Sequence, residues 1–368
     1  MRDVLILAGE ASGDLHGSAL ALQLLRLEPE IRLSGTGGAR MQAAGVRLIE
    51  HVDGVVGFVE VLRHLPAHLA LQRRIRERLE SGEIGLVILI DYPGFNLRVA
   101  ADAKRAGVPV LYYITPQVWA WRASRLETMA EVITRAAVIL PFEEPLLRDH
   151  DIDATFVGHP LLDRAQDLPA QRAARARIGV STDGPVLALF PGSRAQEIER
   201  HLDDFTAVAR ELTSRIPELQ VVLSVAPTVN LPARALPFPA VRAASFDVLR
   251  AATAALCKSG TTTLEAAVAD CPCVIVYRTS ALSYFIARQF VHIPDIGLLN
   301  IVAGRRVAPE FVQDAFQPTA VADALAPLLA PDDLARSVMR RGLAEVRRRL
   351  GTAGASERVA RMALEMMT

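Results

Sequence analysis

Short apolar runs of about four or five residues alternate along the chain with longer segments in which apolar positions recur at helical spacing. The runs predict strands at residues 4–7, 86–90, 110–114 and 137–140. The longer segments predict helices, as at residues 66–80 and 97–106. Strands that alternate with helices are typical of βαβ units on a parallel sheet, so we expect an α/β fold.

The same alternation starts again after a polar stretch punctuated by Pro and Gly at residues 163–185. Further strands are predicted at residues 186–190, 219–224, 254–257 and 273–277, and the chain reads as helical from Pro318 onward. A chain of 368 residues is too long for one ordinary hydrophobic core. We therefore predict two doubly wound, Rossmann-like domains in series.

Composition narrows the class of protein. The 41 Lys and Arg residues balance the 41 Asp and Glu residues, so there is no overall field that favours nucleic acid. Three cysteines without a CxxC pair favour a reducing compartment and disfavour structural zinc. The sequence shows no secretory leader and no apolar run of about 18 residues, so we expect a cytoplasmic protein whose membrane contact, if any, is peripheral.

The first candidate site follows the strand at residues 4–7. Three glycines surround Glu10 and Asp14, and a helix is expected to begin near Asp14. The spacing matches neither dinucleotide-binding nor P-loop fingerprints, and an acid in the turn repels a diphosphate. A sugar, or an attacking hydroxyl that needs a base, fits better; the alternative is that Asp14 caps its helix and Glu10 lies on the surface.

Two further motifs follow strands of the first half. Asp91 ends a strand in IDYPGFN, which makes it a candidate general base, and Asn96 is expected to cap the next helix or to bind ligand. A turn-forming Asp is the alternative for Asp91. Both tryptophans of the chain lie in YYITPQVWAWR at residues 112–122, which indicates either a wall for sugar or lipid or core packing.

The second half repeats the strand, glycine turn and helix pattern twice. In LFPGSRAQEI, the amides after Gly192, the Ser193 hydroxyl and the Arg194 guanidinium form a candidate anion site. In CKSGTTTLEAAVADCP, a turn at residues 259–261 precedes Glu265, whose carboxylate can accept two ribose hydroxyl bonds. The alternative for this second motif is a capped helix with a surface Glu.

Other signals carry less information. His64 and His68 have helical spacing, but no third metal ligand is adjacent, and Cys271-Pro-Cys273 reads as core. The arginine-rich segment at 338–350 is interpreted as a solvated helix face, with an acidic-surface or membrane contact as the alternative. Residues 51–72 place apolar side chains close in sequence to Arg63, Arg73, Arg74 and Arg76, which favours an acyl-chain or membrane surface over a core helix. That surface is expected to include Val56, Phe58, Val59 and Leu62.

Eight motifs stand in order along the chain: GEASGD, DYPGFN, TPQVWAWR, LPFE, FVGHP, PGSR, SGTTTLEA and LLNIVAGRRVAPEFVQ. Together they closely resemble the lipid-A-disaccharide synthase family from about residue 4 to about residue 350. The resemblance implies the GT-B arrangement, with two Rossmann-like domains facing a cleft and a C-terminal helix that crosses back to the first. It assigns an acceptor- and lipid-binding domain to residues 1–165 with 345–368, and a UDP-sugar-binding domain to residues 166–344.

The family's activity is implied in the same way. It is an inverting, metal-independent transfer of 2,3-diacylglucosamine from UDP to the 6-hydroxyl of 2,3-diacylglucosamine 1-phosphate, without a cofactor. The family works as a peripheral enzyme on the cytoplasmic face of the inner membrane, and a homodimer is an open alternative. Rival interpretations are an enzyme like UDP-N-acetylglucosamine 2-epimerase and an inactive nucleotide-sugar-binding protein.

The resemblance also indicates which residues act. The catalytic acids are Asp91 and Glu10, and the choice between them as the base stays open. His16 ranks below Asp91 as a base. The expected substrate-binding residues are Ser12, Asp14, Asn96, Gln117, Trp119, Gly192, Ser193, Arg194, Ser259, Gly260, Thr261, Glu265 and Asn300.

Overall fold

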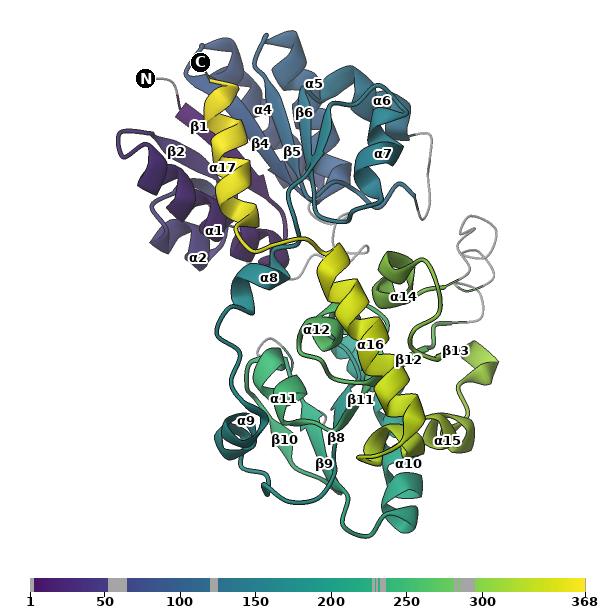
Figure 1. Cartoon of the computed structure of the whole chain (residues 1–368). Coiled ribbons are helices and arrows are strands. Elements are labelled where there is room, and N and C mark those ends of the chain that lie inside the picture. Colours follow the sequence, from purple (N-terminus) through teal and green to yellow (C-terminus); the bar gives the residue numbers. More distant parts are fainter. Residues whose placement is uncertain are drawn as a thin grey trace. The chain divides into compact units, whose positions relative to one another are not determined.

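The computed structural model describes residues 3–51, 65–119, 125–226, 229, 231, 236–280, 284 and 295–367. The chain forms two compact units (Figure 1). The first consists of Met1–Asp163 with Gly351–Thr368, and the second of Arg164–Leu350. Each unit contains one parallel sheet, which confirms the predicted two-domain α/β architecture.

The first unit has a seven-stranded sheet with the order β3-β2-β1-β4-β5-β6-β7, in which all pairs are parallel. Its strands are β1 (Asp3–Ala8), β2 (Leu33–Gly37), β3 (Arg47–His51), β4 (Ile84–Ile90), β5 (Val110–Tyr113), β6 (Arg135–Val138) and β7 (Ala154–Phe156). The strand order reverses between β1 and β4. In open α/β sheets, ligands bind at such a reversal, beside the carboxyl ends of the strands.

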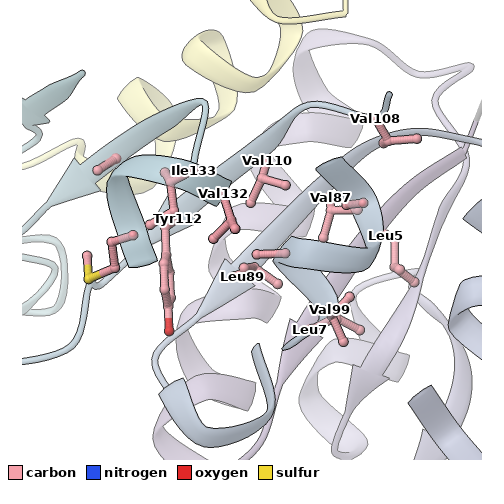
Figure 2. Close-up of a cluster of buried hydrophobic side chains, with 14 of the residues drawn as sticks. Leu5, Leu7, Val87, Leu89, Val99, Val108, Val110, Tyr112, Val132 and Ile133 are labelled. Atoms are coloured by element: carbon pink, nitrogen blue, oxygen red, sulfur yellow. The ribbon is translucent and has the colours of Figure 1, made fainter. Parts of the chain in front are cut away.

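The central strands of this sheet are buried on both faces. Leu5 and Leu7 of β1 pack in one hydrophobic cluster, which Figure 2 shows, while Val4 and Ile6 belong to a second cluster. Because helices cover both faces, the strands are apolar at every position rather than at alternate ones. The helices are α1 (Ala11–Leu27), α2 (Ala39–Ala43), α4 (Leu65–Glu80), α5 (Pro93–Arg105), α6 (Arg125–Val132), α7 (Glu143–Arg148), α8 (Leu161–Arg164) and α17 (Ala355–Glu365).

The C-terminal helix α17 belongs to the first unit, as expected from the resemblance (Figure 1). Val359 and Ala363 of α17 pack in the same cluster as β1. At its ends, Glu357 pairs with Arg26 at 2.9 Å and Glu365 with Arg135 at 3.1 Å. Apolar burial therefore holds this helix, because such exposed ion pairs contribute at most about 1 kcal/mol each.

The second unit has a six-stranded parallel sheet with the order β10-β9-β8-β11-β12-β13. Its strands are β8 (Val186–Phe190), β9 (Gln220–Ser224), β10 (Ala240–Val241), β11 (Ala254–Lys258), β12 (Cys273–Tyr277) and β13 (Glu310–Val312). Its helices are α9 (Gln171–Ile178), α10 (Ala195–Arg215), α11 (Ser245–Ala251), α12 (Thr262–Val268), α14 (Leu298–Ala303), α15 (Pro318–Leu329) and α16 (Leu334–Arg349). Cys271 and Cys273 are buried, as their interpretation as core predicts.

Several short strands are absent from the predictions, and β2 shows why. Its sequence is Leu-Ser-Gly-Thr-Gly, which carries little apolar signal, yet all five residues are buried. A Cβ added at Gly35 would lie 1.8 Å from the Ile6 carbonyl oxygen, so the neighbouring strand requires glycine there. In the parts of the chain that the structure describes, no helix combines the length and the apolar character needed to span a bilayer.

Candidate active-site residues in the two units

Glu10 and Asp91 leave neighbouring strands at the reversal point of the first sheet. Ala8, the last residue of β1, pairs with Ile90, the last residue of β4. Each acid follows its strand within two residues, so both are placed at the carboxyl edge of the sheet. Two carboxylates at this position can serve a proton-transfer reaction, and their catalytic role stays a prediction.

Asp91 occupies an unusual backbone conformation. Asp91 and Tyr92 both adopt left-handed angles, with φ of 47° and 50°. Such a conformation disfavours non-glycine residues by about 1–2 kcal/mol each, and surrounding bonds must hold it. The Asp91 carbonyl accepts hydrogen bonds from the Tyr112 hydroxyl at 2.8 Å and from the Asn96 amide at 2.7 Å. Strain at a strand end is typical of functional turns.

The electrostatic environment makes Asp91 a stronger base than an ordinary aspartate. Burial raises the pKa of the Asp91 carboxyl above its usual value, and the negative charge of Glu10 raises it further. A hydrogen bond from the Tyr92 backbone opposes this shift without cancelling it. The residue as a whole nevertheless keeps an exposed surface, so a hydroxyl could reach it.

Asn96 has a different place from the one expected. It is 1 % exposed and lies inside α5, where its amide nitrogen donates to the carbonyls of Ile90 at 3.2 Å and Asp91 at 2.7 Å. The side chain therefore fixes the turn that carries Asp91 and does not cap the N-terminus of α5. Its binding to substrate stays a prediction.

The glycines of the first motif make room for side chains. A Cβ at Gly9 would lie 2.3 Å from Cγ of Tyr92, and one at Gly17 would lie 2.5 Å from Sδ of Met41. The hydroxyl of Tyr92 in turn lies 3.0 Å from Nε2 of His68. The Tyr92 ring thus packs on the residue before Glu10 and follows Asp91, so it joins the two acidic turns.

Asp14 stabilises a distant backbone segment. Helix α1 begins at Ala11, three residues before the predicted start, so Asp14 is not its N-cap. The buried Asp14 carboxylate instead accepts hydrogen bonds from the amides of Gly38 at 2.7 Å, Met41 at 2.9 Å and Arg40 at 3.2 Å, where α2 begins. Ser12 is exposed beside it. Substrate binding by either residue stays a prediction.

A buried acid that the sequence predictions omitted holds Trp119. The indole of Trp119 donates to Oε1 of Glu143 at 3.1 Å and meets the Phe142 ring edge-on at 5.1 Å. Burial raises the pKa of Glu143 to about 7, although the indole bond and the Leu140 amide favour its ionised form. Glu143 stands in the LPFE motif directly before Glu144, and this pair of acids after an apolar run was the available signal. Gln117 is exposed on the same loop.

The second unit repeats this geometry with glycine turns. Phe190 of β8 pairs with Cys257 of β11 across the reversal of strand order, so PGSR and SGT follow neighbouring strands. Gly192 and Gly260 have φ of 143° and 155°, which side chains rarely tolerate. Ser193, Arg194 and Thr261 are exposed, and Ser259 is partly buried. The two turns therefore leave the same edge of the sheet at neighbouring strands, and anion binding by their residues stays a prediction.

The Glu197 carboxylate accepts hydrogen bonds from two backbone amides of the predicted anion site. Its Oε2 accepts from the Ser193 amide at 2.9 Å and from the Arg194 amide at 3.3 Å, and its Oε1 accepts from Nζ of Lys258 at 2.8 Å. Burial alone would raise the pKa of Glu197, but the charge and hydrogen bond of Lys258, together with the Ser193 amide and the charge of Arg194, lower it below its usual value. Neither residue belongs to the predicted set.

Glu265 is buried, which excludes the surface position considered as its alternative. Its carboxylate accepts a hydrogen bond from the guanidinium of Arg164 at 3.3 Å, and Cζ of Arg164 lies 5.3 Å from the centroid of the Phe246 ring. Burial raises the pKa of Glu265 and the charge of Arg164 only partly offsets that rise. Ribose binding by this carboxylate stays a prediction.

Asn300 organises a loop. It is fully buried, and its Oδ1 accepts from the amides of Val307 at 2.8 Å and Ala308 at 2.9 Å. Its amide nitrogen donates to Glu310 at 2.8 Å. Glu310 also accepts from the amide of Ile296. The Ile296 carbonyl in turn accepts a hydrogen bond from the Ser259 hydroxyl at 2.8 Å. Asn300 is therefore connected to the SGT turn through Glu310 and the backbone of Ile296.

Some predicted residues lie outside the described part of the chain. These are the four membrane or acyl-chain residues Val56, Phe58, Val59 and Leu62, together with His64. Within the described ranges, no three His, Cys, Asp or Glu side chains gather in a metal-binding arrangement. His68 instead contacts Tyr92.

Solved structures similar to this chain define its class. The calicheamicin glycosyltransferase CalG4 has a TM-score of 0.63 at 18% identity, with coverage of 100% of this chain and 98% of that one. A UDP-GlcNAc 2-epimerase from Neisseria meningitidis, bound to UDP-GlcNAc, has a TM-score of 0.64 at 11% identity, with coverage of 99% and 100%. At such identities the likeness concerns the fold alone. Together with the two parallel sheets, it places the chain in the GT-B fold class.

Sequence comparison gives the family. The model of the lipid-A-disaccharide synthetase family matches residues 4–359. A lipid-A-disaccharide synthase of Syntrophus aciditrophicus (strain SB) is 44% identical over 374 residues, which cover 99% of this chain and 97% of the relative. The chain belongs to the lipid-A-disaccharide synthase family of glycosyltransferases, which confirms the resemblance. The likeness to epimerases is one of fold only.

Proposed function

We propose that this protein transfers a 2,3-diacylglucosamine unit from its UDP carrier to the 6-hydroxyl of 2,3-diacylglucosamine 1-phosphate. The products are a β-1,6-linked disaccharide 1-phosphate and UDP. Family membership over residues 4–359 supports the reaction class. The observation that carries the residue assignment is the placement of Glu10 and Asp91 at the reversal point of the first sheet.

Asp91 acts as the general base in this proposal. It accepts the proton of the acceptor 6-hydroxyl while that oxygen attacks the anomeric carbon opposite the bond to UDP, so the anomeric configuration inverts. Such proton transfer contributes about 10²- to 10⁴-fold in rate. The charge of Glu10 raises the pKa of Asp91, which makes the base stronger. Glu10 is therefore assigned a supporting role beside the base.

The second unit stabilises the departing UDP. Arg194 and Ser193 are exposed at the N-terminus of α10, a helix of 21 residues whose dipole favours an anion there. The turn at Ser259, Gly260 and Thr261 follows the neighbouring strand and supplies further donors. Arginine is suited to this task because its planar guanidinium can bind two phosphate oxygens at once.

The acylated substrates imply a lipid surface. We assign the protein to the cytoplasmic face of the inner membrane, with residues 51–72 holding acyl chains or contacting headgroups. The support is the sequence pattern, which combines Val56, Phe58, Val59 and Leu62 with nearby arginines. Replacing Phe58 and Leu62 with Ser should lower liposome binding, and unchanged binding would contradict this assignment.

One experiment tests the reaction directly. The purified protein is incubated with a UDP-diacylglucosamine and the monosaccharide phosphate acceptor, and the products are identified by mass spectrometry. We expect a tetra-acylated disaccharide phosphate together with UDP in equal amounts. Conversion of the donor to an epimer without acceptor, or no product at all, would contradict the proposal. Asp91→Asn serves as the low-activity control.

A further inference from the structure

We propose that Lys258 is a further residue that binds the diphosphate of the donor. In the absence of nucleotide, Glu197 holds the Lys258 ammonium group in an ion pair that breaks when the nucleotide binds. This inference rests on the proposed function, because it assigns a new residue to the same nucleotide site. It concerns only groups of the second unit, all of which the structure describes.

Lys258 stands between the two glycine turns. It is the last residue of β11, directly before the turn at Ser259 and Gly260. A Cβ at Gly260 would have Nζ of Lys258 at 3.9 Å, and no other described heavy atom within 4 Å. As far as the described residues show, the space beside this turn is open and bordered by an ammonium group.

Glu197 connects the turn at Ser193 and Arg194 to the same ammonium group. Nζ of Lys258 lies 2.8 Å from Oε1 of Glu197, and Oε2 of that carboxylate accepts the amides of Ser193 and Arg194. The ion pair is largely shielded from water, with side-chain exposures of 17% for Lys258 and 18% for Glu197. A charge in such surroundings acts more strongly than one in bulk water.

The bonding of Glu197 allows Lys258 to leave. When the Lys258 ammonium leaves, the Glu197 carboxylate still accepts hydrogen bonds from the amides of Ser193 and Arg194. The exchange therefore leaves no buried charge without a hydrogen-bond partner. A diphosphate carries more negative charge than a carboxylate and attracts the ammonium more strongly. Lysine suits such an exchange because its charge sits on a long flexible stem. We therefore expect Lys258 to move from Glu197 to a diphosphate oxygen while Glu197 remains on the amides.

The chain offers a direct readout, because it contains only two lysines, Lys104 and Lys258. Reductive methylation with ¹³C-formaldehyde keeps their charge and gives each lysine its own NMR signal. Lys104 belongs to the first unit and is exposed, so it is an internal control. We expect UDP to shift the Lys258 signal saturably and to leave the Lys104 signal in place. A Lys258 signal that stays still while calorimetry detects UDP binding would overturn the inference.

Two variants distinguish a lysine that binds UDP from an ion pair that only stabilises the loop. Lys258→Met should weaken UDP binding at least about tenfold, the effect of losing one charged hydrogen bond. Glu197→Gln can still accept both amides but no longer competes for the ammonium, so its UDP affinity should equal or exceed that of the wild type. Equal losses of UDP affinity in both variants would mean that the ion pair only stabilises the loop, and would overturn the inference.

Two further measurements keep these outcomes interpretable. Thermal unfolding establishes that each variant is folded, and Lys258→Arg, which keeps the cation, should recover most of the affinity lost in Lys258→Met. If Lys258→Arg and Lys258→Met bind UDP equally well, the charge has no role and the inference fails. Wild-type protein that binds no UDP would contradict the proposed function as well, whereas UDP binding that is independent of Lys258 contradicts this inference alone.

Discussion

The amide of Asn96 donates a 2.7 Å hydrogen bond to the carbonyl of Asp91, five residues earlier in the chain. Its second bond, to the Ile90 carbonyl, fixes the end of β4 at the same time. The candidate base therefore stands on a turn whose left-handed backbone is held from one side by a buried amide and from the other by the Tyr112 hydroxyl. The geometry at Asp91 depends on residues that need not touch substrate.

Asn96→Ala should lower the free energy of unfolding by about 1–3 kcal/mol, because the Ile90 carbonyl loses the Asn96 amide and the Asp91 carbonyl loses one of its two side-chain donors. We also expect turnover to fall, since the strained turn loses one of its restraints. Chemical denaturation and an activity assay measure the two effects. The exposed amide Gln117 provides a stability control, because Gln117→Ala should change stability by less than about 0.5 kcal/mol. Equal stability of both variants would argue against a restraining role for Asn96.

The pH dependence of turnover should report the environment of Asp91. A general base must be ionised, so kcat/KM should fall on the acid side with a midpoint above the ordinary pKa of aspartate, since burial and Glu10 raise the pKa of Asp91. Glu10→Gln removes the nearby negative charge and should move that midpoint to lower pH. A midpoint that stays in place or rises in this variant would contradict the effect of the Glu10 charge on the pKa of Asp91.

Gly9→Ala should disturb the packing between the two acidic turns. The new Cβ would lie 2.3 Å from Cγ of Tyr92, so the ring or the backbone must shift, at a cost of about 1–3 kcal/mol. Tyr92→Ala in the same chain should recover part of that stability. Gly94→Ala is the matched control, because Gly94 has no described atom within 4 Å of the added Cβ. Similar losses at both glycines would refute the packing argument.

Glu143 should make stability depend on pH. Burial raises the pKa of Glu143 to about 7 from its usual 4.5, so the folded protein binds this proton more tightly than the unfolded chain. The associated stability is present below about pH 4.5 and is lost as pH rises toward 7, by an upper estimate of about 3 kcal/mol. Glu143→Gln, which cannot ionise, should lack this loss. Parallel stability curves for both proteins between pH 4.5 and 7 would contradict the assignment.

Local sequence patterns were sufficient to predict two α/β domains with parallel sheets and to locate the motifs. Strands buried on both faces need apolar residues at every position, which is why β1, β4 and β8 were visible as continuous runs. Because ligand-binding loops follow strands in parallel sheets, the turns at Asp91 and Gly192 could also be placed in advance. Short strands with polar or glycine-rich sequences, such as β2, lacked this signal.

Only the tertiary structure decided which partner each polar group has. Asp14 caps a helix that begins more than twenty residues later, and Glu197 pairs with Lys258 across a separation of 61 residues. The sequence by itself determined periodicity, turn chemistry and charge, since these depend on neighbours along the chain. Contacts between distant residues are set by how the sheet brings strand ends together. The same glycine or carboxylate can therefore approach a ligand or hold a loop, and the packed fold decides between these roles.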